Sequence, residues 1–209
     1  MTDVARYPVQ VEVTSPVHFD RMQLLLRLAL AIVLGWIGVT AGWLTALLYL
    51  VLPVIAAVVI SSDGEARYLD AFGSRMWRVL SWVLAFSAYM LLLVDRFPVG
   101  SERDGVRIQL AATGHPTPGS ALLRFLTSLP SAFVLCILSF VSSILFVIAV
   151  VFVLFGAEMP HGILSFQRGF LAWEARLLAY HASLVEEYPP FSMDTPVVGR
   201  AAPGQASPA

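Results

Sequence analysis

Three histidines and one carboxylate have the types and spacings that could take part in metal binding or catalysis. Glu158 and His161 lie three residues apart, a spacing that can present two metal ligands on one helix face. Pro160 lies between them, so we expect a solvated turn and no metal site. His18 and His115 each precede a long apolar run, and neither has the neighbouring nucleophile or matching partner that catalysis would need. Polar anchoring at an interface is the favoured interpretation of both.

Arg27 and Arg124 stand at matching positions where the two apolar runs begin. Snorkelling toward the membrane interface is the favoured interpretation of a guanidinium at that place, and contact with a lipid phosphate is the alternative. The sequence holds no phosphate loop, no serine or cysteine elbow and no paired-carboxylate signature. We therefore expect a protein that is not an enzyme, with no catalytic residue, no cofactor and no bound metal.

The composition indicates an integral membrane protein. Hydrophobic residues make up 58% of the 209 residues and charged residues 13%, with a mean hydropathy of +0.78, whereas soluble domains are about a quarter charged. The net charge of -1 and the lack of a basic cluster exclude nucleic acid as a partner. Cys136 is the single cysteine, so no disulfide can form within the chain.

Two uncharged runs organise the chain, residues 28–62 and 125–157. A helix over the 35 residues of the first run would be ~52 Å long, while the hydrocarbon core of a bilayer is ~30 Å thick. Each run therefore predicts a transmembrane hairpin. We expect its turn near residues 40–42 in the first run, where glycines gather, and around Ser139, Ser142 and Ser143 in the second.

A strand precedes each hairpin and a helix follows it. Residues 7–14 and 106–111 alternate apolar and polar side chains, the pattern of a half-buried strand. The helix after the second hairpin carries an aromatic stripe that includes Trp173 and Tyr180, flanked by charges that would be costly at the bilayer centre. We expect it to lie at the interface, and Trp82 and Tyr89 mark the matching stripe in the first half. That first helix lacks flanking charges, so the sequence leaves open whether its part 79–94 spans.

The two halves of the chain are similar to each other. A shift of 97 residues superposes the strands, the histidines and the arginines that open the hairpins, and a shift of 91 superposes Trp82 on Trp173 and Tyr89 on Tyr180. The predicted first repeat is 1–100, with strand 7–14, transmembrane hairpin 24–61 and closing helix 68–94. The second is 101–193, with strand 106–111, hairpin 122–157 and closing helix 163–185, and a disordered tail follows at 194–209. The predicted fold class is a mainly α integral membrane protein with two tandem repeats, amphipathic interfacial helices and a small cytoplasmic β element.

One family has this combination of features. The strand that begins Tyr-Pro-Val, the Arg-Leu at each hairpin, Trp173 with Ala179-Tyr180, and the exit at 186–191 (Glu-Glu-Tyr-Pro-Pro-Phe) together resemble a bacterial membrane family catalogued as domain of unknown function 4389. The resemblance covers residues 7–193 as two tandem copies. The first copy departs from it at its exit, where Val99 follows Pro98. The resemblance implies a membrane protein and carries over no catalytic residues.

These patterns predict a non-enzymatic scaffold or accessory subunit of the bacterial inner membrane, multi-pass, with cytoplasmic termini by the positive-inside rule. Its partners would be membrane lipids and either a membrane protein or further copies of itself. The expected lipid or interface contacts are Arg27, Arg124, Trp82, Tyr89, Trp173 and Tyr180. The alternative is an oligomeric transporter of lipids or small molecules, although both apolar runs lack the ionisable groups that ion-coupled transport uses.

Overall fold

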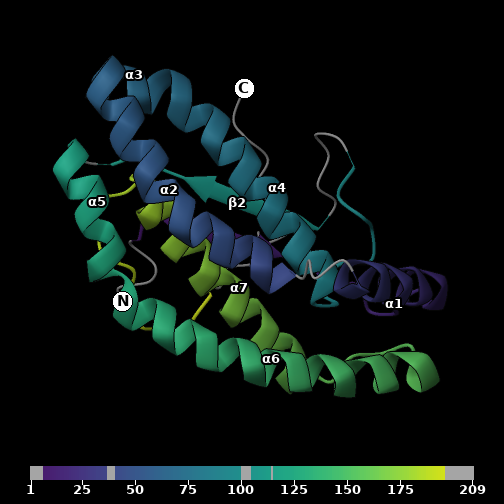
Figure 1. The fold of residues 1–209 in the computed structure, drawn as a ribbon. Coiled ribbons are helices and arrows are strands. Elements are labelled where there is room, and N and C mark those ends of the chain that lie inside the picture. The colour runs from purple at the N-terminus through teal and green to yellow at the C-terminus, as the bar shows by residue number, and fades with distance from the viewer. Residues whose placement is uncertain (1–6, 37–40, 100–104, 114, 196–209) are drawn as a thin grey trace, which may run out of the picture.

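The computed structural model describes residues 7–36, 41–99, 105–113 and 115–195 as a mainly helical protein with one small sheet (Figure 1). Strand β1 (Val9–Val13) pairs antiparallel with β2 (Val106–Leu110), and Val11 lies opposite Ile108. Val9 and Val11 are almost completely buried, while Arg107 and Gln109 on the other face are exposed. Apolar and polar residues alternate in these strands because one face of the sheet packs against the protein. The predicted small β element is confirmed.

Two helices lie directly under the buried face of this sheet. Helix α7 (His161–His181) contacts β1, helix α4 (Ser74–Met90) contacts β2, and the two helices contact each other. Small side chains allow this close approach, since Ala88, Ala172 and Ala179 are completely buried. The main apolar core is built around these helices and the sheet, and it includes Leu84 and Leu178.

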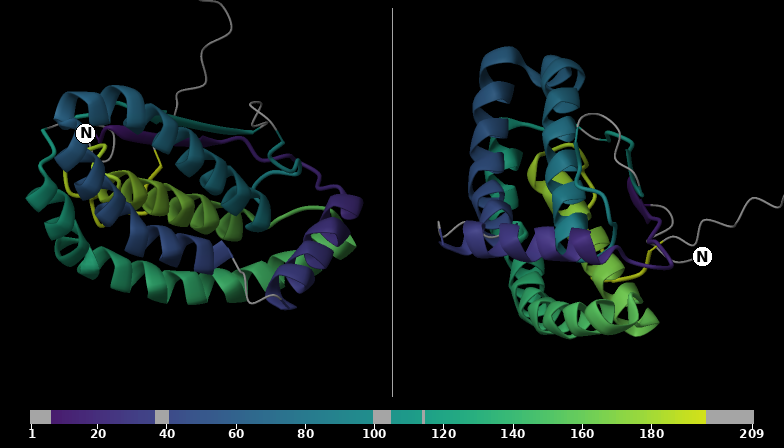
Figure 2. Two further views of the ribbon diagram at one scale, coloured as in Figure 1. Left: turned by 45° about the horizontal axis from the view of Figure 1, so that its top comes forward. Right: turned by 90° about the vertical axis from the view of Figure 1, so that its right-hand side faces the viewer.

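The remaining long helices lie outside this central pair. They are α1 (Arg21–Trp36), α2 (Ala41–Asp63), α5 (Pro118–Thr127) and α6 (Leu129–Gly156). Helix α2 packs on α5, and α1 packs on α6. Figure 2 (left) shows α5, α6 and α1 along one edge of the molecule and the strands along the opposite edge. Two segments, Ala46–Asp63 and Leu129–Gly156, are long and apolar enough to cross a membrane.

The predicted second hairpin (122–157) is wrong, because α6 is one uninterrupted helix of 28 residues. The hydroxyls of the serines that were expected to make a turn form hydrogen bonds with the same helix or with the neighbouring helix α7. Ser139 Oγ donates to the Cys136 carbonyl at 2.7 Å, and Ser143 Oγ donates to the Ser139 carbonyl at 2.8 Å. The chain instead changes helix at Ser128, before Pro130, whose missing N–H is tolerated in a first helical turn.

The first predicted hairpin (24–61) is two helices, α1 and α2, and part of its expected turn lies outside the described residues. In Figure 2 (right) α1 runs across the direction of α2 instead of lying antiparallel beside it. The predicted closing helix 68–94 begins as a π-helix, Tyr68–Gly73, which follows a short turn of helix, α3 (Glu65–Arg67), and continues as α4. Most of the predicted tail, 194–209, falls outside the described residues.

Helix α7 is a central helix of the protein, and its predicted position at a membrane interface stays a prediction. It runs along α6, with Gln167 against Ser142 near the middle of both helices and His181 against Ser128 at one end. Every residue from 171 to 185 is buried, including Glu174 and Arg176. The flanking charges that made an interfacial position favourable are enclosed by the protein itself.

Candidate functional site

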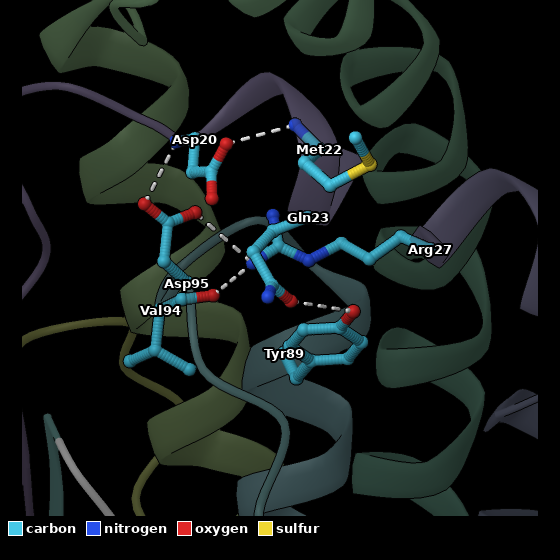
Figure 3. A network of polar contacts seen from close by, with 7 residues as sticks. All are labelled: Asp20, Met22, Gln23, Arg27, Tyr89, Val94 and Asp95. Atoms are coloured by element: carbon cyan, nitrogen blue, oxygen red, sulfur yellow. Dashed lines mark hydrogen bonds and ion pairs between the residues drawn. The ribbon is translucent and has the colours of Figure 1, made fainter. Parts of the chain in front are cut away.

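The most enclosed charge in the described structure is the guanidinium of Arg27, on the second turn of α1 (Figure 3). Nη2 donates to the carbonyl of Val94 and lies 3.3 Å from Oδ1 of Asp95, just past the end of α4. The guanidinium carbon lies 4.3 Å from the centroid of the Tyr89 ring. A main-chain carbonyl, a carboxylate and an aromatic face thus stabilise a cation whose side chain has no exposed surface.

The carboxylate of Asp95 ties the start of α1 to the same place. Its Oδ2 accepts from the backbone N–H of Asp20 at 3.0 Å, and Oδ1 of Asp20 accepts from the N–H of Met22 at 2.8 Å, as an N-cap does. The Tyr89 hydroxyl lies 3.4 Å from Oε1 of Gln23. Helix α1 is therefore fixed to the C-terminal end of α4 through polar contacts (Figure 3).

Arg124, on α5, has a matching set of contacts in the second half of the chain. Its Nη1 donates to the carbonyl of Tyr180 at 2.8 Å and to the carbonyl of Val185. The guanidinium carbon lies 4.7 Å from the centroid of the Tyr180 ring. Val185 and Tyr180 follow Val94 and Tyr89 by 91 residues, so each arginine binds equivalent atoms at the end of the helix that closes its half.

The two helix ends also have the same backbone. Leu92 and Ser183, again 91 residues apart, both adopt a left-handed conformation, with φ of 60° and 55°. In each case the following N–H returns to the helix: Leu93 donates to Ala88, and Leu184 donates to Ala179. We call each set of arginine, tyrosine ring and C-terminal carbonyls an arginine cradle. The cradles differ in their acid: Asp95 pairs with Arg27, whereas its equivalent Glu186 is exposed.

A chain of three polar side chains, two of them buried, adjoins the second cradle. The hydroxyl of Tyr49, on α2, lies 2.8 Å from Oγ of Ser128, which lies 3.1 Å from Nε2 of His181. Burial, with a smaller contribution from nearby Arg124, lowers the pKa of His181 to about 4. The imidazole is therefore neutral at pH 7. Met90 stands at the equivalent position in the first half, so the first half has no counterpart of His181.

Five of the six residues expected at a lipid or partner interface lie inside the protein. Arg27 and Tyr89 have no exposed surface, and Arg124, Trp173 and Tyr180 are between 4% and 8% exposed. Trp82 is 39% exposed, stacks on Phe86 and donates Nε1 to the Pro98 carbonyl at 3.2 Å. Whether any of the six contacts a lipid stays a prediction, and in this packing only Trp82 presents much surface for one.

The structure brings together some of the histidines and acids that the sequence offers as candidate metal ligands or catalytic groups. Nδ1 of His18 lies 3.5 Å from Oε1 of Glu158 with both side chains mostly exposed, and His115 contacts Glu65 at the surface. His161 begins α7 and is exposed. Within the described ranges, no group of three or more His, Cys, Asp or Glu side chains is placed to hold a metal ion.

Several polar contacts of α7 have no signal in the sequence that would single them out. Gln167 bonds both the hydroxyl and the carbonyl of Ser142, at 2.6 and 3.0 Å. Arg176 donates to the carbonyls of Ser192 and Asp194, which holds the exit of the chain against α7. Matching arginines and tyrosines in the two halves are the one sequence pattern that points to the cradles.

The described fold is that of a mainly helical protein with two candidate membrane-spanning helices, and the arginine cradles join its helix ends. Residues 118–193, from α5 to the exit after α7, match the family described as domain of unknown function (DUF4389). This part of the chain therefore carries a domain of that family, as the resemblance predicts. The match covers one copy and does not extend to residues 7–117. No curated protein matches the chain, and no solved structure matches it.

Proposed function

We propose that the protein is a non-enzymatic scaffold or accessory subunit of the bacterial inner membrane, with its termini and its sheet on the cytoplasmic side. Its outer helices would hold it in lipid, and the sheet with the surrounding loops would form the surface that meets a partner. The observation that carries this proposal is the separation of two opposite faces, one apolar and one polar.

Large apolar side chains are exposed on four helices, α1, α2, α5 and α6. Phe140 on α6 is 70% exposed and Phe155 is 77% exposed, values that leave whole aromatic rings in contact with the surroundings. So many exposed apolar side chains are typical of contact with lipid or with another protein. We call this face the apolar layer; it includes Leu25, Leu26, Ile32, Leu47, Leu50, Val54, Val58, Leu122, Leu123, Leu126, Phe133, Ile137, Phe140, Ile144, Val147, Val151 and Phe155.

We further propose that the fold is a tandem duplication with an approximate twofold axis. Val11 lies opposite Ile108, its own equivalent under the 97-residue shift, so the axis passes between these two residues. The helix contacts follow the same symmetry, since α2 packs on α5 and α1 packs on α6. The two arginine cradles are a third equivalent pair.

The cradles support a structural function over a catalytic one. Each guanidinium is directed at carbonyls and a ring of its own chain, which leaves little of it accessible to a substrate. Each cradle instead fixes the angle between an outer helix and a central helix. A pair of such joints suits a rigid scaffold that keeps its apolar layer and its sheet in one relative orientation.

The first test is purification from native membranes in a mild detergent, followed by mass spectrometry of the proteins and lipids that accompany the tagged chain. A stoichiometric protein partner is the expected result. A homo-oligomer that carries one enriched lipid and transports it without any partner would overturn the scaffold in favour of the transporter.

A pair of variants tests the apolar layer separately. Phe140→Lys places a charge in the middle of the layer and should shift the protein from the membrane fraction toward the soluble or aggregated fractions. Gln109→Lys places the same charge on the exposed face of β2 and should leave the distribution unchanged. Equal behaviour of the two variants would contradict attachment through the apolar layer.

A further inference from the structure

We infer that the protein lies flat in one leaflet, with α4, α6 and α7 parallel to the membrane plane, and that α6 does not cross the bilayer. This inference rests on the proposed membrane attachment and states how that attachment is made. It replaces the multi-pass arrangement that the sequence predicts.

The sheet runs parallel to the central helices, which is the first step of the argument. At one end, the N–H of Thr113 donates to the carbonyl of Leu184, just past the C-terminal end of α7, at 3.1 Å. At the other end, a Cβ added to Gly105 would lie 2.9 Å from Cγ1 of Val94, just past the C-terminal end of α4. The segment 105–113, which contains β2, therefore runs from the C-terminal end of α4 to the C-terminal end of α7. The sheet follows the direction of these helices, so it must share their tilt in the membrane.

The two central helices are antiparallel, so their ends define two ends of the molecule. The N–H of Asp20 binds Asp95 and the N–H of Phe19 binds the Ala157 carbonyl, which joins the C-terminal end of α4 to the N-terminal ends of α1 and α7. At the opposite end, the Tyr68 hydroxyl donates to the Ala182 carbonyl, beside the second arginine cradle. The first cradle thus lies at one end of the molecule and the second cradle at the other.

Upright helices would place the sheet in hydrocarbon. In the described part of the chain the sheet has two strands, so each strand has an outer edge whose N–H and C=O groups need water. Open sheet edges do not occur in the hydrocarbon region of a membrane. The outward face adds Glu12, Arg107 and Gln109 to the groups that would lose water. Only a flat orientation leaves this sheet in water and the apolar layer in lipid.

The distribution of arginine gives an independent reason. Arg21 and Arg27 lie at the end with the first cradle, and Arg67 and Arg124 lie at the end with the second. Upright helices would place arginines on both sides of the membrane, against the positive-inside rule. A flat orientation places all four of these arginines on one side.

The approximate symmetry agrees with this orientation. Val11 and Ile108 are directly opposite on the same face of an antiparallel pair, so the axis between them is perpendicular to the sheet. In the flat orientation that axis runs along the membrane normal, and the two halves contact the leaflet in the same way. Figure 2 (left) shows the resulting layers, with the strands opposite α5, α6 and α1.

The test measures the depth of four sites along α6 in vesicles of bacterial phospholipids. In a Cys136→Ala background, the variants Phe133→Cys, Phe140→Cys, Val147→Cys and Phe155→Cys each carry an environment-sensitive fluorophore. All four wild-type side chains are more than 60% exposed and follow one stripe of the helix. Lipids with a quencher at defined acyl positions then report the depth of each label, and Gln109→Cys with aqueous iodide reports on the sheet.

A flat helix gives the same shallow depth at all four sites and open access of iodide to position 109. A crossing helix gives labels that are deep at 140 and 147, shallow at 133 and 155, and shielded at 109, which would overturn the inference while leaving membrane attachment intact. Failure of the parent protein to float with the vesicles would overturn the proposed attachment itself. The two failures are therefore distinguishable.

Discussion

Loss of the arginine from the second cradle should destabilise the protein strongly, and Arg124→Met is the most informative change. The side chain is 7% exposed, and its Nη1 donates to the carbonyls of both Tyr180 and Val185. Methionine fills much of the same space but leaves both carbonyls without that donor. Hydrogen bonds from a charged donor contribute roughly 1.5–3 kcal/mol each. The cost of burying the guanidinium offsets part of that sum, so we expect a net loss of about 3 kcal/mol.

The assay is thermal unfolding of the purified protein in a mild detergent, followed by tryptophan fluorescence. For a chain of this length, 3 kcal/mol corresponds to a decrease in melting temperature of roughly 6–12 °C. Arg75→Met is the matched control, because Arg75 is exposed near the start of α4. Arg124→Lys should retain part of the stability, since an ammonium can still donate to one carbonyl, and it keeps the test available if the methionine variant does not fold. A melting temperature of Arg124→Met no lower than that of Arg75→Met would refute the structural role of the cradle.

Three further predictions concern the central helix α7. The pKa of His181 is about 4 in the folded state and 6.5 in the unfolded chain. As the pH falls, the unfolded chain therefore binds a proton at His181 before the folded protein does. The free energy of unfolding should then decrease by about 3 kcal/mol between pH 6.5 and pH 4. His181→Met, the residue that the first half has at this position, should flatten that pH profile of the melting temperature, and an unchanged profile would contradict the assignment. Gln167→Leu should cost about 1 kcal/mol by removing the bonds to Ser142, and Ser142→Ala in the same background should add little if the two side chains act as a pair. Trp173→Asp buries a carboxylate beside Leu135 and Leu177 and should cost upwards of about 3 kcal/mol, measured as loss of the folded fraction in detergent; retention of folding would show that this face of α7 is not packed as described.

The sequence predicts the local structure of this chain better than its packing. Alternation of apolar and polar residues in 7–14 and 106–111 predicts strands with one packed face. In the structure that face packs against α4 and α7. Periodic apolar residues likewise predict a helix at 163–185, where α7 extends from His161 to His181. Both signals are local, because burial of one face imposes a repeat of two or of 3.6 residues on the sequence itself.

The second hairpin is wrong because length alone does not decide where a helix ends. The argument from the thickness of a bilayer assumes that an apolar helix stands upright, and α6 runs for 28 residues without a turn. Serine hydroxyls can bond carbonyls of their own helix, as Ser139 and Ser143 do, so serines are weak signals for a break. A helix that lies in the plane of a leaflet has no such limit on its length.

The sequence identifies the arginines and tyrosines of the two cradles, but it does not identify the atoms that these arginines bind. Matching shifts identify Arg27 with Arg124 and Tyr89 with Tyr180, yet the atoms that each arginine binds are 56 to 68 residues away along the chain. An arginine at the start of an apolar helix therefore looks the same whether it snorkels to a lipid phosphate or binds the carbonyls of a distant helix end. Burial decides between these, and burial depends on the tertiary fold.

Extraction of bacterial membranes with alkaline carbonate and high salt tests the central claim most directly. Apolar contact with lipid does not depend on charge, so salt screening should not weaken it. If the apolar layer attaches the chain to the membrane, the full-length protein stays in the washed membrane pellet and is released only by detergent. Recovery of a folded, monodisperse protein in the carbonate supernatant would contradict membrane attachment and, with it, the proposed scaffold.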